Sequence, residues 1–202
     1  GYINAGQVCI SVQRVIVERD VEASFLDALT PKVQAISVGD PSRDETEVGS
    51  LISEADAARV EAAINEVVKD GATLVTGGER HGAMIEPSIV RGVPAEHGFA
   101  QEELFGPAVS ITTADNLDHA IELANSTRYG LGAGVFSHNM DTSIRAMREI
   151  DAGVVHINWT PLWRADLMPY GGLKDSGIGK EGVRTAVRDM SDWKTVILHS
   201  RA

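Results

Sequence analysis

The order of apolar and polar residues predicts that strands and helices alternate along the chain. Residues 10–18 are rich in β-branched side chains, which is typical of a strand. In residues 21–33 the apolar positions recur near helical spacing, and residues 54–69 carry a one-sided apolar stripe that closes at Gly71. The first third of the chain is therefore expected to form a strand followed by two helices.

The same alternation continues towards the C-terminus. Further short strands are expected within residues 73–78, 86–93, 107–114, 130–137, 153–159 and 193–200. Further helices are expected over residues 117–125 with Asp115 as N-cap, 142–150 with Asp141 as N-cap, and 180–190. Helices between short apolar strands favour α/β layering around a mostly parallel sheet, in one domain followed by a terminal arm.

Composition narrows the class of protein. The chain has 202 residues, of which 43% are hydrophobic and 23% charged, a balance typical of a globular protein. A chain of this length can bury a core without disulfides or a structural metal. It holds a single cysteine and no closely spaced His and Cys residues, so a disulfide scaffold is excluded and no metal site is expected. Any chemical role of Cys9 is that of a thiol.

The net charge of −11 repels phosphate backbones and anionic lipid, so we expect neither nucleic acid nor a membrane as partner. No apolar run is long enough to span a bilayer, and no signal peptide is recognisable, so a cytoplasmic location is expected. The chain starts at Gly1 inside a motif-like stretch, which indicates that it is a piece of a longer protein.

Residues 4–9, Asn-Ala-Gly-Gln-Val-Cys, carry the first candidate chemistry. A thiol just after a glycine-containing turn, at the start of a strand, is held rigidly while its sulfur stays near a loop surface, as a covalent nucleophile requires. The alternative is a buried cysteine that acts as a small hydrophobic residue, because Cys9 is flanked by Val8 and Ile10.

Two further segments contain unusual patterns. Residues 101–107, Gln-Glu-Glu-Leu-Phe-Gly-Pro, by themselves indicate a solvated turn above a hydrophobic anchor. Residues 169–182 contain glycines at 177, 179 and 182 in G-x-G-x-x-G spacing. A dinucleotide fingerprint needs a preceding strand and an acidic residue about 20 positions later within a βαβ unit. A Pro- and Gly-rich loop precedes these glycines and the chain ends soon after them, so we reject that assignment.

Taken together and in this order, the segments 4–9, 101–107 and 169–182 resemble the NAD(P)-dependent aldehyde dehydrogenase superfamily. Shorter similarities lie at residues 38–41, 49–53, 129–131 and 153–158. The resemblance runs from end to end, but it covers only the C-terminal part of such an enzyme. It implies a three-layer αβα catalytic domain over residues 1–190, a C-terminal oligomerisation arm over 191–202, and an N-terminal nucleotide-binding domain that this chain lacks.

The resemblance implies a mechanism for Cys9. In the family, the thiolate at this position attacks the aldehyde, hydride leaves for the nicotinamide of NAD or NADP, and the resulting thioester is hydrolysed to a carboxylic acid. The backbone N–H at Cys9 would supply one oxyanion donor. The second donor and the general-base glutamate lie upstream in the family, so neither Glu102 nor Glu103 is assigned as base. We therefore expect the chain alone not to oxidise aldehydes.

The resemblance also implies binding roles. Glu103 matches a glutamate that accepts hydrogen bonds from the nicotinamide ribose, and Phe105 matches the aromatic ring packed beside that ribose. Tyr170 stands where a phenylalanine more usually lines the substrate pocket, so its hydroxyl suggests a more polar pocket.

The remaining pocket residues flank these motifs. Val8 and Ile10 would shape the pocket beside the cysteine, and Trp163 and Arg164 fall where the family places a substrate-contacting loop. Arg164 is suited to pair with an acidic tail on the aldehyde, as in lactaldehyde-like, phosphonate- or semialdehyde-like substrates. The alternative is an arginine that is exposed or paired with Asp166.

Two other functions remain open. Cys9, His156 and Asn158 have the residue types of a thiol hydrolase, although nothing in the sequence brings the predicted strand of His156 to Cys9. The chain could instead be a folding and assembly module without activity of its own. In either enzyme reading, the resemblance suggests that residues 193–200 pair with a sheet of a neighbouring subunit in a homo-oligomer.

Overall fold

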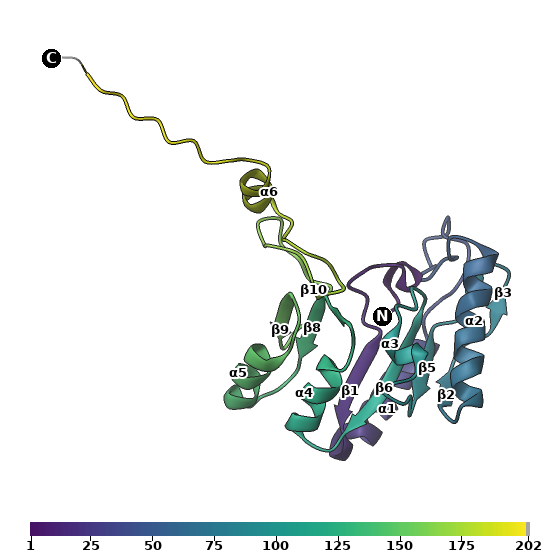
Figure 1. Cartoon of the computed structure of the whole chain (residues 1–202). Coiled ribbons are helices and arrows are strands. Elements are labelled where there is room, and N and C mark those ends of the chain that lie inside the picture. Colours follow the sequence, from purple (N-terminus) through teal and green to yellow (C-terminus); the bar gives the residue numbers. More distant parts are fainter. Residues whose placement is uncertain (201–202) are drawn as a thin grey trace.

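The computed structural model describes residues 1–200, and its centre is a four-stranded sheet (Figure 1). The strands β1 (Arg14–Glu18), β6 (Ala108–Ala114), β5 (Ser88–Arg91) and β2 (Thr73–Thr76) lie in that order. β6 runs parallel to both β1 and β5, whereas β2 runs antiparallel to β5 at the edge. The prediction of an α/β fold with a mostly parallel sheet is confirmed.

Alternate residues of the central strands face opposite helical layers. Ile89, Val109 and Ile111 pack against α1 (Arg19–Gln34) in one apolar cluster. Their neighbours Val90 and Ala108 belong to a second cluster, which α2 (Glu54–Lys69) and α3 (Gly98–Gln101) cover on the other face. Because side chains alternate across a strand, the near-continuous apolar runs of β5 and β6 supply both faces. The three-layer arrangement follows from this alternation.

A smaller unit follows the central sheet in the chain. β8 (Gly132–Val135) and β9 (Val154–Ile157) pair in parallel, and α5 (Met140–Glu149) connects them. β7 (Tyr129–Gly130) pairs antiparallel with β10 (Leu173–Lys174), which joins the end of the chain back to this unit. Figure 1 shows this unit beside α4 and β1.

The start of α4 (Leu117–Asn125) corrects one prediction. Its N-cap is Asn116, whose side chain accepts a hydrogen bond from the His119 backbone N–H at 3.0 Å, and not Asp115. Asp115 lies one residue too early to reach that N–H group, and its carboxylate pairs with Arg19 instead.

The predicted N-cap of α5 is also wrong. Asn139 caps this helix, because its side-chain oxygen accepts from the backbone N–H groups of Asp141 and Thr142 at 2.9 and 3.1 Å. The helix therefore begins at Met140, two residues before the expected start, and Asp141 lies inside its first turn. An acidic residue in the first turn is still favourable beside the positive end of the helix dipole.

The remaining elements are short. They are the 3-10 turn η1 (Ile3–Gly6), the hairpin of β3 (Arg80–His81) and β4 (Met84–Ile85), and α6 (Val183–Asp189). α6 is shorter than the expected helix over residues 180–190, since it begins only after Gly182, which has a φ of 121°. No helix in the described part of the chain is long and apolar enough to cross a membrane.

The terminal arm extends away from the folded body (Figure 1). Residues 193–200 were expected to form a strand, but they are exposed and pair with no other strand of the described chain. A strand needs a partner for its backbone hydrogen bonds, and residues 1–200 offer none to the arm. Residues 201–202 of the arm lie outside the described residues.

Candidate functional site

The turn before Cys9 has an unusual backbone. Asn4, Ala5 and Gly6 all have positive φ angles, of 51°, 55° and 73°. Gln7 fixes the turn, because its backbone N–H donates to the Asn4 carbonyl at 3.0 Å and its side-chain oxygen accepts from the Ile52 N–H at 2.9 Å. Ala5 is only 1% exposed and anchors the turn in the core. The predicted rigid turn is present, although β1 starts at Arg14, so Cys9 lies on the loop before the strand.

The thiol of Cys9 is free and exposed. The alternative of a buried cysteine is therefore wrong. The sulfur lies 2.9 Å from the hydroxyl oxygen of Tyr170, which comes from the other end of the chain. The structure thus brings together two residues that the sequence placed in one site.

The loop that carries Glu103 packs directly on the cysteine loop. A Cβ atom on Gly6 would overlap the carbonyl of Gly106 and would lie 2.9 Å from the Pro107 nitrogen. Only glycine allows this approach of two backbones. Gly6 is therefore what lets these loops meet, whereas a Cβ on Gly106 would instead collide with Val60 of α2.

Gln13 joins the same two loops, and sequence reasoning missed it. Its side-chain nitrogen donates to the carbonyl of Glu102, and its side-chain oxygen accepts from the Leu104 N–H at 2.8 Å. Leu104 is buried, so its neighbours Glu103 and Phe105 point outwards, and Phe105 is 41% exposed. A glutamine that follows a motif carries no local signal of such a role, because its partners are distant in sequence.

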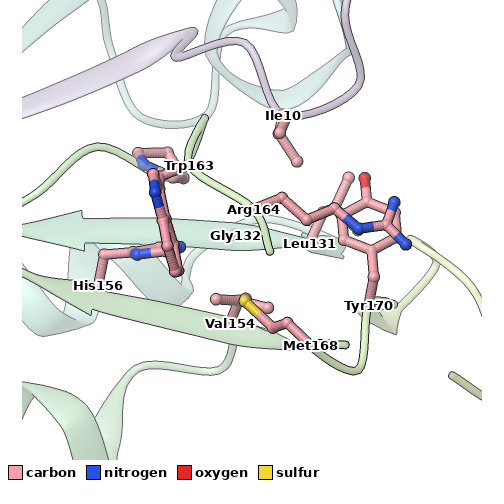
Figure 2. Close-up of a pocket in the computed structure, with 10 residues that line it drawn as sticks. Ile10, Leu131, Gly132, Val154, His156, Trp163, Arg164, Met168 and Tyr170 are labelled. Carbon is pink, nitrogen blue, oxygen red and sulfur yellow. The ribbon is translucent and has the colours of Figure 1, made fainter. Parts of the chain in front are cut away.

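The predicted substrate residues gather at one pocket. Ile10, Trp163, Arg164 and Tyr170 line it together, as Figure 2 shows. The other lining residues are Leu131, Gly132, Val154, His156, Pro161 and Met168. Val8 is not among them. The pocket holds only about 10 Å³ as it stands, which is room for a water molecule.

Cys9 itself lines a neighbouring open groove of about 440 Å³. Tyr170 and Leu131 belong to both cavities, so the pocket adjoins the groove. Residues 171–172 and 176–181 form much of the groove wall. Glu103 and Phe105 line neither cavity.

Arg164 stacks on Tyr170. Its guanidinium carbon lies 4.3 Å from the ring centroid, within the range of a cation–π contact. Its ion partner is Glu181 at 3.8 Å, and not Asp166. Burial raises the pKa of Tyr170 above its usual value, and the hydrogen bond with Cys9 raises it further, so the phenol keeps its proton near neutral pH.

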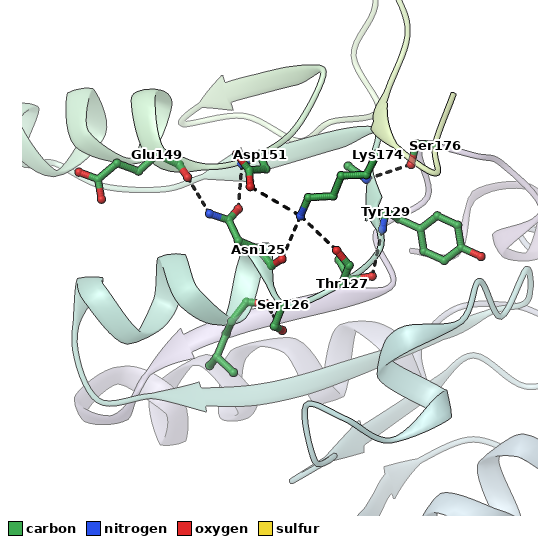
Figure 3. A network of polar contacts seen from close by, with 10 residues as sticks. Asn125, Ser126, Thr127, Tyr129, Glu149, Asp151, Lys174 and Ser176 are labelled. Atoms are coloured by element: carbon green, nitrogen blue, oxygen red, sulfur yellow. Dashed lines mark hydrogen bonds and ion pairs between the residues drawn. The ribbon is translucent and has the colours of Figure 1, made fainter. Parts of the chain in front are cut away.

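The glycine-rich loop is fixed by cations that donate to backbone carbonyls. Figure 3 shows Lys174, whose ammonium donates to the carbonyls of Asn125 and Thr127 at 2.9 and 3.1 Å. Ser176 accepts from the Gly130 N–H at 2.9 Å, and Lys180 donates to the Gly171 carbonyl at 2.8 Å. The glycines at 177, 179 and 182 follow the antiparallel β10 rather than a strand of a βαβ unit. This agrees with the rejection of a dinucleotide fingerprint.

His156 does not join Cys9 in a hydrolase-like arrangement. Its ring packs edge-on against Trp163, with the centroids 6.1 Å apart, and its Nε2 atom is buried with no hydrogen-bond partner among residues 1–200. Asn158 instead accepts from the Ser137 N–H at 2.8 Å. Within residues 1–200 no group of His, Cys, Asp and Glu side chains is placed to hold a metal ion.

Comparisons with known proteins agree over nearly the whole chain. The model of the aldehyde dehydrogenase family matches residues 1–196. A 3-sulfolactaldehyde dehydrogenase of Priestia megaterium is 39% identical over 196 residues, which are 97% of this chain and 41% of that protein. A lactaldehyde dehydrogenase of Methanococcus maripaludis is 37% identical over 199 residues, which are 98% of this chain and 43% of that protein.

Solved structures show the same likeness. Aldehyde dehydrogenase 21 of Physcomitrella patens, in complex with the reaction product succinate, has a TM-score of 0.89 at 38% identity, over 92% of this chain and 39% of that one. A glyceraldehyde-3-phosphate dehydrogenase of Methanocaldococcus jannaschii, complexed with NADP, has a TM-score of 0.92 at 36% identity, over 96% and 42%. The chain thus spans about two fifths of the length of these relatives.

Proposed function

Because this chain belongs to the aldehyde dehydrogenase family, we propose that it supplies the catalytic cysteine of an NAD(P)-dependent aldehyde dehydrogenase. The observation that carries the proposal is the exposed thiol of Cys9, held on a rigid turn beside an open groove. Residues 1–190 would act as the catalytic domain and residues 191–202 as the oligomerisation arm.

In this proposal the Cys9 thiolate attacks the carbonyl carbon of the aldehyde. A carbon–sulfur bond forms, and the carbonyl oxygen takes the negative charge, for which the Cys9 backbone N–H is one donor. Loss of hydride from the same carbon leaves a thioester on Cys9. Water then breaks the carbon–sulfur bond and gives the carboxylic acid and the Cys9 thiol, which loses a proton to re-form the thiolate. A bound nicotinamide cofactor supplies the hydride acceptor.

Glu103 and Phe105 fit the nicotinamide end of such a cofactor. They are an outward-pointing carboxylate and ring on a loop packed against the cysteine loop. A carboxylate accepts from both hydroxyls of a ribose. The structures of similar proteins with NADP and with NAD⁺ support this cofactor class for the chain.

The polar groups around the pocket favour a short polar aldehyde. The Tyr170 hydroxyl lies 2.9 Å from the Cys9 sulfur, and the Arg164 guanidinium stacks on the Tyr170 ring. The Nε2 atom of His156, which has no hydrogen-bond partner among residues 1–200, belongs to a side chain that lines the same pocket as Arg164 and Tyr170. A hydroxyl or acidic group on the aldehyde would accept from the Arg164 guanidinium. The similar enzymes that act on lactaldehyde and sulfolactaldehyde, and the one bound to succinate, support this substrate class.

The exposed arm would pair with a neighbouring subunit. Trp193, Ile197 and Leu198 are each more than two-thirds exposed in the single chain. A partner sheet would cover these apolar side chains and satisfy the backbone, giving a homo-oligomer.

The nucleophile is tested by acyl transfer, which needs no cofactor. With p-nitrophenyl acetate, the intact mass should show one acetyl group on the chain, and Cys9→Ser should abolish it. Equal acetylation of Cys9→Ser would contradict the assignment. His156→Ala should leave acetylation unchanged, whereas its loss would favour the thiol hydrolase.

The dehydrogenase is tested in two steps. The 202 residues alone should not reduce NAD⁺ with aldehyde, because the family base and second oxyanion donor are expected outside them. Joined to the upstream part of the Methanococcus maripaludis lactaldehyde dehydrogenase, the chain should support aldehyde-dependent NAD(P)H formation that Cys9→Ser removes. A folded but inactive chimera would contradict the proposal.

A further inference from the structure

We propose that Tyr170 is a positioning residue for Cys9: its phenol donates a hydrogen bond to the thiolate, keeping it ionised and aimed into the groove. This inference rests on the proposed function, in which Cys9 is the nucleophile. It assigns to the hydroxyl of Tyr170 a role that a phenylalanine ring cannot perform.

The hydrogen bond with Tyr170 stands alone at the Cys9 sulfur. The sulfur and the phenol oxygen are 2.9 Å apart, and within residues 1–200 the thiol has no other hydrogen-bond partner. Among the described residues no Lys, Arg or His forms a hydrogen bond with the sulfur, and the charged side chains that line the same groove are Lys180, Glu181 and Asp189. A hydrogen bond to the charged form of an acid lowers its pKa, so this single donor would favour the thiolate.

The direction of the bond follows from the acidities of the two groups. An ordinary thiol ionises near pH 8.5 and an ordinary phenol near pH 10. Burial raises the pKa of Tyr170 further, so the phenol stays protonated over the pH range in which an ordinary thiol ionises. Once Cys9 is a thiolate it can only accept, and the phenol is the donor.

Other contacts hold the tyrosine ring without help from the sulfur. The Tyr170 backbone N–H donates to the Glu181 carbonyl at 3.1 Å, and the Arg164 guanidinium covers the ring. Lys180 fixes the next residue through the Gly171 carbonyl at 2.8 Å. Removal of the hydroxyl should therefore leave the ring in place and delete only the hydrogen bond.

The bond should weaken when the reaction begins. As the sulfur bonds to carbon, its negative charge passes to the carbonyl oxygen, and a neutral sulfur is a weak acceptor. The phenol would then be released from the sulfur during the attack. A thiolate with a lowered pKa is also intrinsically less nucleophilic. Tyr170 would therefore raise the fraction of Cys9 that is ionised and lower the rate at which each thiolate attacks.

The test is the pH dependence of Cys9 alkylation by iodoacetamide, between about pH 5 and about pH 10. In Tyr170→Phe the midpoint should rise by about one unit, so that labelling near neutral pH slows about tenfold. The plateau rate at high pH should be equal or higher. Thiolate ultraviolet absorbance, measured as a difference from Cys9→Ser, should report the same shift.

Tyr129→Phe is the matched control. It also removes one phenol, which accepts from Arg128 at 2.7 Å and has no hydrogen bond with Cys9, so the midpoint should not move. An unchanged midpoint in Tyr170→Phe would overturn the proposal, because Tyr170 would then only line the pocket. A lowered midpoint would show that the thiol donates to the phenol, and would also overturn the proposal.

A second measurement protects the test against misfolding of the variant. Replacement of the chain's three tyrosines by fluorotyrosine makes each phenol a stronger donor, so the Cys9 midpoint should fall. No fall would contradict the proposal. Acetylation of Cys9 by p-nitrophenyl acetate is read separately: its absence would refute the proposed function, whereas a normal acetylation with an unmoved midpoint would refute only the role of Tyr170.

Discussion

The contact between the two motif loops predicts a large difference between two otherwise equivalent glycine substitutions. Gly6 and Gly92 have nearly equal φ angles, of 73° and 71°. A Cβ on Gly92 would meet open space, whereas one on Gly6 would overlap the Gly106 carbonyl. Gly6→Ala and Gly92→Ala therefore share the backbone strain and differ only in the space available.

The expected loss in the free energy of unfolding follows from the backbone strain and from the space available to the new Cβ. A left-handed φ costs a non-glycine residue about 1–2 kcal/mol, of which about 0.4–1 kcal/mol is offset by a less flexible unfolded chain. Gly6→Ala adds overpacking against a backbone that cannot rotate away, typically about 1–3 kcal/mol. The free energies of unfolding of the two variants should differ by that last amount.

Urea denaturation measures the difference. With a slope of about 2 kcal/mol per molar, Gly6→Ala should unfold at a midpoint about 0.5–1.5 M below that of Gly92→Ala. Its Cys9 should also label differently with iodoacetamide, because the cysteine loop must shift. Equal midpoints for the two variants would refute the claim that glycine is required for the contact between residues 4–9 and 101–107.

Three other perturbations test other parts of the structure. Glu22 is buried, and its hydrogen bonds from Arg91 at 2.5 Å and Thr113 at 2.8 Å hold its pKa below the usual value, the Arg91 bond being the larger cause. The contribution of Glu22 to stability should therefore be complete above about pH 4.5 and decline as the pH falls through the lowered pKa. Glu22→Gln should lower the free energy of unfolding by about 1–2 kcal/mol at pH 7 and by less near pH 3. An equal loss at both pH values would contradict a stabilising role of the ionised carboxylate. Lys174→Met removes the donor to two carbonyls and should lower the free energy of unfolding, measured in urea, by about 1–3 kcal/mol. A loss no greater than that caused by Lys194→Met, at an exposed lysine of the arm, would refute the importance of this network. In the chimera, Arg164→Gln should raise KM for lactaldehyde or succinic semialdehyde by about tenfold and leave propionaldehyde unchanged, and an equal effect on all three would exclude a role in recognising the polar group.

Much of the fold can be predicted from local sequence. The helix over residues 54–69 has the predicted bounds because its apolar stripe is flanked by an N-cap at Ser53 and by the glycine at 71, and each of these signals acts over a few residues. The cap positions of α4 and α5 were predicted wrongly because two neighbouring polar residues compete there, and the start of the helix decides between them.

The motifs of the sequence determined the family resemblance and the candidate residues, among them Cys9, Arg164 and Tyr170. They could not determine which of these side chains meet. The contact of Cys9 with Tyr170 joins positions 161 residues apart, and that of Gly6 with Gly106 joins two other distant loops. His156 is the opposite case: its residue type suits a thiol hydrolase, but its ring packs against Trp163 and not against the thiol.

There is a physical reason why the sequence predicts the elements and motifs but not the contacts between them. Periodicity, capping and turn chemistry act over a few residues, so the chain's own sequence determines its strands, helices and motif loops. The meeting of loops depends on the order β1-β6-β5-β2 and on close backbone approaches that only packing creates. The sequence by itself thus determined the elements and the chemistry available, and the tertiary structure decided that the thiol lies exposed beside a single phenol.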